Sequence, residues 1–144
     1  MSQTIVVGYD ASTSGNRALE FALNEAKSKG ANVLIAHVLE WSPYSFLTPE
    51  ELEERHKRRG EELARAEQAV LGPVVEKAKA IGVAAETELR YGHIAETLCA
   101  IADEKSASQV VIGRTGHSEL ASRLFGSVAG TLAQASPVPV TIVP

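Results

Sequence analysis

The chain has 144 residues, a length that suits one domain with a single hydrophobic core, so we expect residues 1–144 to form one unit. A composition of 44% hydrophobic and 22% charged residues is typical of an ordinary soluble globular protein and excludes a disordered or fibrous one. The formal net charge of -4 provides no positive field that would attract nucleic acid or an anionic membrane.

The first ten residues lack a basic start followed by an apolar signal segment, and no apolar stretch approaches the roughly 18 residues that span a bilayer. We therefore expect a cytoplasmic protein without membrane insertion. The lone Cys99 lies in an apolar helical pattern with Leu98 and Ile101, which favours a buried, inert thiol over a reactive one.

The N-terminal third predicts a strand, a helix and a second strand. The apolar runs Ile5 to Gly8 and Val33 to Leu39 are typical of strands. Between them Gly30 marks the end of a helix, whose apolar residues recur at the spacing of one buried face: Leu19, Ala22, Leu23 and Ala26.

A second helix is predicted from Thr48, where a capping hydroxyl precedes a proline and two glutamates, to about Ala80. Gly72 and Pro73 interrupt it and predict a kink or two helices, since proline lacks the amide proton. The basic run from Arg55 to Arg59 is surrounded by glutamates and favours a solvated helix face over a nucleic-acid site.

The second half continues the alternation. Strands are predicted at Val83 to Leu89, Val110 to Ile112 and Val138 to Val143. Two helices lie between them, one after Gly92 and one near Ser127, with these residues facing inward: Ile94, Leu98 and Ile101, then Val128, Leu132 and Ala135.

Strands joined by helices predict an α/β fold, an open five-stranded parallel sheet with helices on both faces, and the first, second and fourth strands are apolar enough for its centre. Such Rossmann-like sheets bind ligands beyond the carboxyl ends of their strands, where the strand order reverses. Asp10 and Gly113 follow the first and fourth strands and are expected at that place.

A glycine pattern directly after the fourth strand indicates a phosphate site. Gly113, Gly116 and Gly126 let backbone amides approach phosphate closely, and Ser127 opens a helix whose free amides favour an anion. The alternative is that these glycines serve only turns and a helix start.

Several polar residues have two interpretations. Asp10 either contacts the nucleotide or caps the next helix, a role for which Ser12 to Ser14 compete. His37 and His93 are interpreted as structural. Three cations either neutralise phosphate or are simply solvated: Arg114, His117 and Arg123.

No catalytic or metal-binding motif accompanies this pattern. The chain has no Walker phosphate loop and no cysteine or histidine cluster at metal spacing. Phe125 stands where a hydrolase nucleophile elbow at Ser127 requires glycine. Glu119 is the only carboxylate between Gly113 and Ser127, so fast hydrolysis is not expected.

The chain resembles the universal stress protein family, and its glycine motif matches the ATP-binding subclass of that family. The resemblance covers nearly the whole length and is carried by Val6-Val7-Gly8-Tyr9-Asp10-Ala11-Ser12, Ala36-His37-Val38, Val111-Ile112-Gly113-Arg114-Thr115-Gly116-His117-Ser118, Gly126-Ser127-Val128-Ala129 and Pro137-Val138-Pro139-Val140. One departure is Ser108-Gln109, where the family commonly has Asp-Leu before the strand.

The resemblance implies an adenine nucleotide alpha-hydrolase-like fold that binds ATP, with Mg2+ allowed at the phosphates. It implies adenine near Asp10, Ala11 and Val38. Ribose and phosphates would lie over the glycine motif, and the full set there is Ile112, Gly113, Arg114, Gly116, His117, Gly126, Ser127 and Val128.

The last predicted strand, Val138 to Val143, contains Pro139, which confines it to an edge or places the proline at its entrance. An uncharged edge needs a cover, and the same strand of a second copy supplies one, as the family resemblance also implies. We therefore expect a homodimer through Val138 to Val143.

The expected function is a nucleotide-responsive regulator in stress response, with an unidentified protein partner. The alternatives are a slow ATPase or phosphotransferase, and a partner-binding module with an empty pocket.

Overall fold

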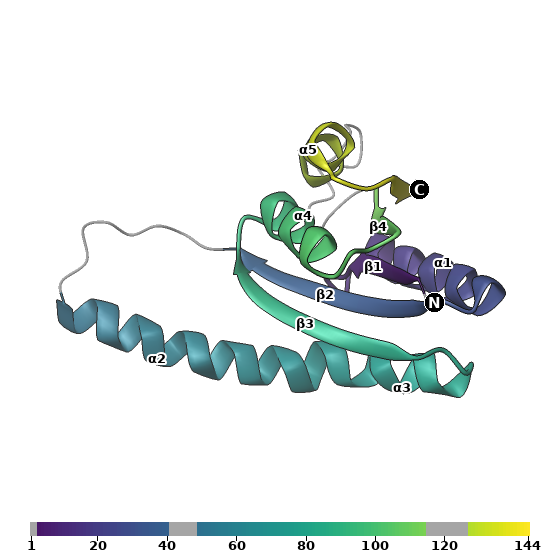
Figure 1. Cartoon of the computed structure of the whole chain (residues 1–144). Helices are drawn as coiled ribbons and strands as arrows, with labels where there is room; N and C mark the ends of the chain where they lie inside the picture. Colours follow the sequence, from purple (N-terminus) through teal and green to yellow (C-terminus); the bar gives the residue numbers. More distant parts are fainter. Residues whose placement is uncertain (1–2, 41–48, 115–126) are drawn as a thin grey trace.

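The structure, a computed structural model, describes residues 3–40, 49–114 and 127–144 (Figure 1). Its five strands form one parallel sheet in the order β3-β2-β1-β4-β5, which confirms the predicted α/β class. The elements in chain order are β1 (Thr4–Gly8), α1 (Thr13–Lys29), β2 (Asn32–Glu40), α2 (Pro49–Ala66), the π-helical turn η1 (Glu67–Leu71), α3 (Gly72–Ala80), β3 (Ala85–Gly92), α4 (Ile94–Glu104), β4 (Gln109–Gly113), α5 (Ser127–Ala135) and β5 (Val140–Val143).

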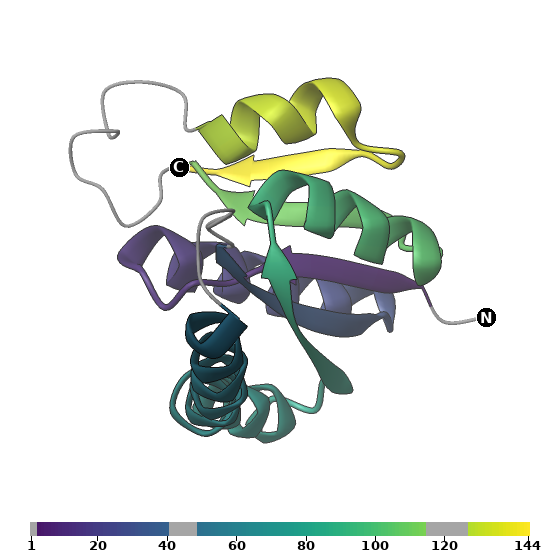
Figure 2. The same ribbon diagram turned by 90° about the vertical axis from the view of Figure 1, so that its left-hand side faces the viewer.

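Helices cover both faces of the sheet, because alternate residues of each central strand point to opposite sides. Val7 and Ile35 pack in one core cluster with α1 and α3, whereas Val6 and Leu34 pack in another with α4 and α5. Figure 2 shows β5 at one edge beside α5, and α2 near the opposite edge formed by β3. The predicted central strands are confirmed as β1, β2 and β4.

The predicted ends and breaks of the first helices are confirmed. Gly30 ends α1 in the left-handed conformation, with φ 66°, and its amide donates to the Ala26 carbonyl. The interruption at Gly72 and Pro73 is a π-helical turn followed by α3, because Pro73 offers no amide proton to continue the α-helical ladder. The predicted cap Thr48 lies outside the described residues.

Three details of the sequence prediction were wrong. β3 begins at Ala85 rather than Val83, because the Val83 amide donates to the Ala78 carbonyl and so closes α3. β5 begins at Val140, two residues after the predicted start. Ala135 is exposed rather than buried. The inward face of α5 is formed instead by Ala129 and, one turn later, Leu132.

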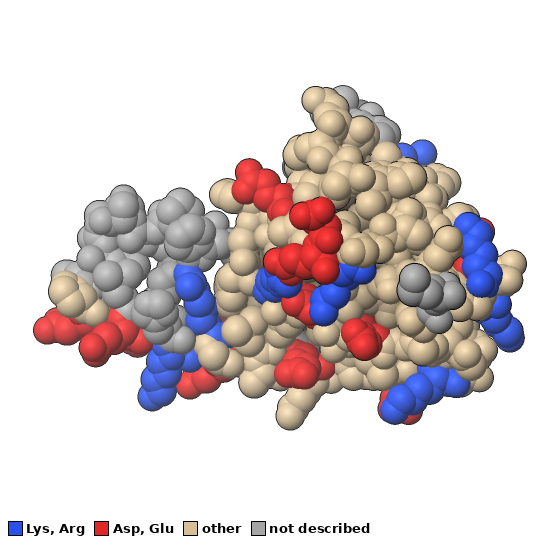
Figure 3. Space-filling view, in the orientation of Figure 1, with Lys and Arg blue, Asp and Glu red and all other residues tan. Residues whose placement is uncertain are grey.

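Charges of both signs are interspersed over the face seen in Figure 3, as the prediction of a solvated α2 requires. Lys57 and Arg58 are exposed, and Arg58 pairs with Glu54 at 3.0 Å. The Arg59 guanidinium lies 5.0 Å from the centre of the Tyr91 ring and connects α2 to β3.

In the described ranges, none of the helices combines the length and apolar character that crossing a bilayer requires.

Candidate functional site

The candidate site lies at the carboxyl edge of β1 and β4, where the sheet reverses its strand order. β2 and β3 lie on one side of β1, whereas β4 and then β5 lie on its other side. β1 and β4 pair in register, Val7 with Val111, so the segments that follow them emerge next to each other. Parallel sheets bind ligands at such a switch point.

Most of the predicted site residues belong to this edge. Asp10 and Ala11 follow β1, and Val38 is near the end of β2. The β4 side carries Ile112, Gly113 and Arg114, and Ser127 and Val128 begin α5. The remaining predicted residues, Gly116, His117 and Gly126, lie outside the described residues, as does Arg123.

The turn between β1 and α1 shows which residue caps the helix. The Ser12 hydroxyl accepts the Gly15 amide at 2.9 Å, so Ser12 is the N-cap. The Asp10 carboxylate Oδ1 accepts the Ser12 amide at 3.0 Å and the Ser12 hydroxyl, so it supports the capping residue. Between them, Ala11 is held at φ 64°, a left-handed conformation that costs a non-glycine residue roughly 1–2 kcal/mol. Strain of this kind persists only where surrounding contacts enforce it.

Gly113 is required by packing as well as by the predicted ligand. A Cβ on Gly113 would lie 2.2 Å from the Ser14 Oγ and 2.7 Å from the Ser14 carbonyl oxygen. Ser14 itself is buried in the first turn of α1. The first glycine of the motif therefore lets the end of β4 touch the start of α1, a function that its sequence context did not reveal.

The buried His37 has the structural role predicted for it. Its Nδ1 lies 2.7 Å from the Tyr9 carbonyl oxygen, which can only accept, so Nδ1 carries the proton. The Tyr9 amide in turn donates to the Ala36 carbonyl at 2.8 Å. These two bonds extend the contact between β1 and β2 up to the turn that carries Asp10.

Tyr9 gives the stability of this region a predicted pH dependence. Burial, and secondarily the negative charge of Asp10, raise the pKa of the Tyr9 phenol above its ordinary value of 10.0. The native state therefore holds this proton more tightly than the unfolded chain does. The resulting contribution to the free energy of unfolding is fully present below about pH 10 and is lost as the pH rises through the native pKa.

Tyr9→Phe should remove this alkaline loss, so its unfolding free energy should decline less steeply than that of the wild type. Urea unfolding between about pH 9 and pH 11 measures the two slopes. Identical slopes would show that Tyr9 titrates alike in the folded and unfolded chains.

Two other candidates lie outside the switch point between β1 and β4. Cys99, predicted to be buried, is only half-buried on α4, because it borders the inward face defined by Leu98 and Ile101. Burial, with Glu96 nearby, raises the pKa of its thiol, which agrees with the predicted low reactivity. His93 is exposed at the N-cap position of α4, where its side chain makes no capping hydrogen bond.

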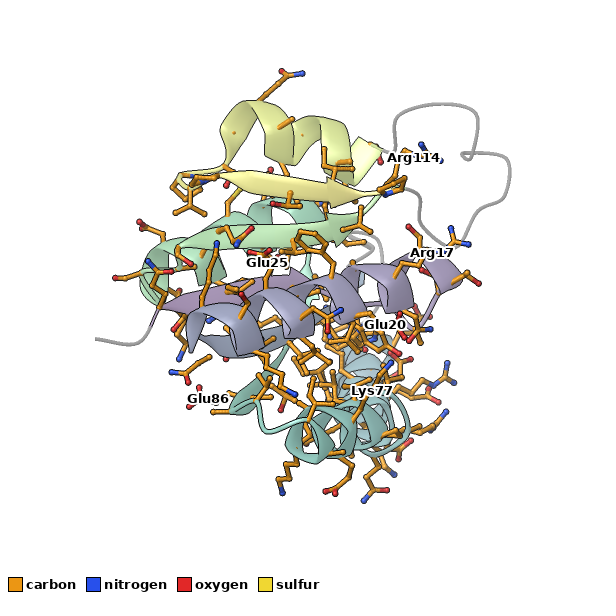
Figure 4. All side chains as sticks on the ribbon, turned by 90° about the vertical axis from the view of Figure 1, so that its right-hand side faces the viewer. Arg17, Glu20, Glu25, Lys77, Glu86 and Arg114 are labelled. Atoms are coloured by element: carbon orange, nitrogen blue, oxygen red, sulfur yellow. The ribbon has the colours of Figure 1, made fainter. Side chains whose placement is uncertain are left out.

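Sequence reasoning missed one cation at the carboxyl edge. Figure 4 shows Arg17, on α1, at the same end of the molecule as Arg114. Within the described part of the chain, neither side chain forms an ion pair. Arg17 is an exposed residue in an ordinary helical pattern, so no sequence signal distinguishes it from a solvated arginine.

The chain matches the model of the universal stress protein family over residues 1–144. It is 32% identical over 143 residues to a universal stress protein of Methanocaldococcus jannaschii, covering 96% of this chain and 80% of that protein. It is 30% identical over 156 residues to universal stress protein YxiE of Bacillus subtilis, covering 99% of each.

Solved structures agree with these relatives. The fold is similar to that of UspA from Lactobacillus plantarum, with a TM-score of 0.85 and 23% identity over 99% of this chain and 97% of that one. A universal stress protein in complex with cAMP has a TM-score of 0.71 and 30% identity, covering 99% and 96% of the two chains. One from Archaeoglobus fulgidus in complex with dAMP has a TM-score of 0.67 and 26% identity, covering 99% and 98%. The matches extend over essentially the whole chain, which therefore belongs to the universal stress protein family.

Proposed function

We propose that this protein binds ATP at the switch point and acts as a nucleotide-responsive regulator, whose occupancy changes the surface that it offers to a protein partner. The observation that carries the proposal is the pairing of β1 with β4, which brings the Asp10 turn next to Gly113 and Arg114. A polar turn beside a glycine-rich, cationic segment suits a ligand that joins a nucleoside to phosphates.

The chemistry of the described residues fits the two ends of such a ligand. On the phosphate side, the Arg114 guanidinium and the Ser127 hydroxyl can donate hydrogen bonds, and the first amides of α5 add partial positive charge. On the nucleoside side, Asp10 offers a carboxylate. Val38 offers apolar surface, because it is only half-buried where it packs against the core cluster of α4. The side chain of Ile112 is buried in that same cluster, so we assign only its backbone to the ligand.

Mg2+ would enter this site with the nucleotide. In the parts of the chain that the structure describes, no three His, Cys, Asp or Glu side chains gather where they could hold a metal ion. Mg2+ commonly retains several waters and binds through substrate phosphates. We therefore assign its ligands mainly to phosphate oxygens and water.

The relatives solved with cAMP and dAMP support an adenine nucleotide. Both of those ligands carry a single phosphate, whereas the long motif from Gly113 to Ser127 offers donors for more than one. Calorimetric titration with ATP, AMP, cAMP and GTP tests this assignment. We expect one ATP per chain, weaker AMP and cAMP, and much weaker GTP; equal affinity for GTP and ATP, or no binding of any of them, would overturn it.

We also propose a homodimer through β5. Among the described residues β5 pairs only with β4, and it carries no charged side chain. The Val110 amide donates to Pro139 and the Arg114 amide to Val143, so alternation along the ladder directs the backbone groups of Val140 and Ile142 away from β4. The opposite edge, β3, is blunted by charges, since Arg90 pairs with Glu88 and Glu104.

Ile142→Lys should convert the dimer to monomers, because it places a charge on β5. Ile142 also packs against the core cluster of α4 and α5, so urea unfolding must show that the variant remains folded. Val140→Pro is a second variant, since it removes an amide that points away from β4, together with the packing of the Val140 side chain against the core cluster of α4 and α5. Light scattering measures the mass of each variant, and Glu86→Lys on the opposite edge is the matched control that should remain dimeric. A dimer that survives both β5 variants would place the interface elsewhere.

A further inference from the structure

The side chain of Asn16 bridges the two flanks of the strained residue Ala11. The Tyr9 hydroxyl donates to Asn16 Oδ1 at 2.9 Å, and Asn16 Nδ2 donates to the Ser12 carbonyl at 3.0 Å. The Ser12 carbonyl can only accept, so the amide orientation is fixed with Nδ2 toward Ser12. The Asn16 amide therefore spans the turn on which Asp10 lies.

Both ends of this bridge are anchored to other parts of the fold. Tyr9 is bound through its amide and carbonyl to Ala36 and His37 of β2. Ser12 is bound to α1, because its hydroxyl accepts the Gly15 amide and its carbonyl accepts the Asn16 amide at 2.9 Å. The helix is thus already capped by Ser12, and the Asn16 side chain is not needed for capping.

We infer that Asn16 is a positioning residue for the nucleotide: it holds the β1–α1 turn in the left-handed conformation that sets the direction of the Asp10 carboxylate. This inference rests on the proposed function. Without the bridge, the left-handed Ala11 keeps only the Asp10–Ser12 hydrogen bonds across it, and we expect its φ to relax from 64°. Relaxation would rotate Asp10 relative to β1 and disturb the nucleoside end of the site, while the phosphate end at Gly113 and Arg114 stays in place.

Asn16→Ala tests the inference, with Asn24→Ala as its matched control. Both asparagines are exposed on α1, so both changes have the same effect on helix propensity. Calorimetry should show Asn16→Ala weakening ATP, AMP and adenosine by the same factor of about tenfold, which corresponds to about one lost hydrogen bond. Asn24→Ala should stay within about twofold of the wild type.

A double-mutant cycle distinguishes positioning from general destabilisation. In the Asp10→Ala background, Asn16→Ala should cause no further loss of ATP affinity, because its effect passes through Asp10. Tyr9→Phe removes only one bond of the bridge and should show a smaller loss with the same ATP and AMP pattern, which keeps the test available if Asn16→Ala does not fold.

Three outcomes would overturn the inference. An unchanged ATP affinity in Asn16→Ala would remove the positioning role alone, while leaving nucleotide binding intact. The same loss with and without Asp10 would show that Asn16 acts on the whole fold. A wild type that binds no adenine nucleotide would overturn the proposed function and this role together. Even if the wild type binds no nucleotide, hydrogen exchange at the Ser12 and Gly15 amides tests whether Asn16 holds the turn. Exchange should be faster in Asn16→Ala than in Asn24→Ala, and equal rates would contradict that role.

Discussion

Gly113→Ala is expected to lower the free energy of unfolding by about 1–3 kcal/mol, the usual cost of overpacking. A Cβ at this position would lie 2.2 Å from the Ser14 Oγ and 2.8 Å from the Ser14 carbonyl carbon. The hydroxyl could rotate away, but the backbone carbonyl could not, so β4 and α1 would have to separate. Urea unfolding measures the change.

Gly60→Ala is the matched control for this loss. Gly60 lies in α2, and a Cβ at this position would meet no neighbouring side chain or strand within 4 Å in the described part of the chain. Because alanine is the better helix former, this variant should gain about 0.5–1 kcal/mol. If Gly113→Ala were as stable as the wild type, the packing role of Gly113 would be refuted.

Gly116→Val is expected to reduce ATP affinity by about a hundredfold or more, or about 2.8 kcal/mol. The expectation rests on the sequence, since Gly116 lies outside the described residues: a branched side chain would stand where backbone and phosphate must meet. Calorimetry with ATP measures the loss. Gly60→Val, on the distant helix α2, should bind ATP as the wild type does.

An unchanged ATP affinity in Gly116→Val would favour the alternative that the glycines serve turns only. Gly113→Ala cannot decide this question, because its loss of stability would obscure a loss of binding. The two glycines therefore test different claims, packing for Gly113 and ligand contact for Gly116.

The fold was predictable from the sequence where one physical effect dominates. β1, β2 and β4 are buried on both faces, so their apolar runs identify them as central strands. The start of β3 was misplaced because Val83 is apolar for a different reason: it packs in the core cluster of α1 and α3 while its amide closes α3. Apolar character alone cannot separate these two roles.

The candidate site was only partly predictable, because several roles depend on tertiary contacts. Aspartate and serine are both common N-cap residue types, so the sequence allowed Asp10 or Ser12 as the cap. Only the hydrogen bonds of the structure assign capping to Ser12. The contact of Gly113 with α1 joins segments far apart in the sequence. Asn16 lies on an exposed helical position without periodic signal, so its bridge across Ala11 becomes visible only in the structure.

Native mass spectrometry of the protein purified gently, without added nucleotide, is the decisive experiment on whether the switch point holds an adenine nucleotide. We predict a bound mass equal to one ATP per chain in the wild type, and its absence in Gly116→Val. A wild type that carries no nucleotide, and takes up none after incubation with ATP, AMP or cAMP, would refute nucleotide binding at the switch point.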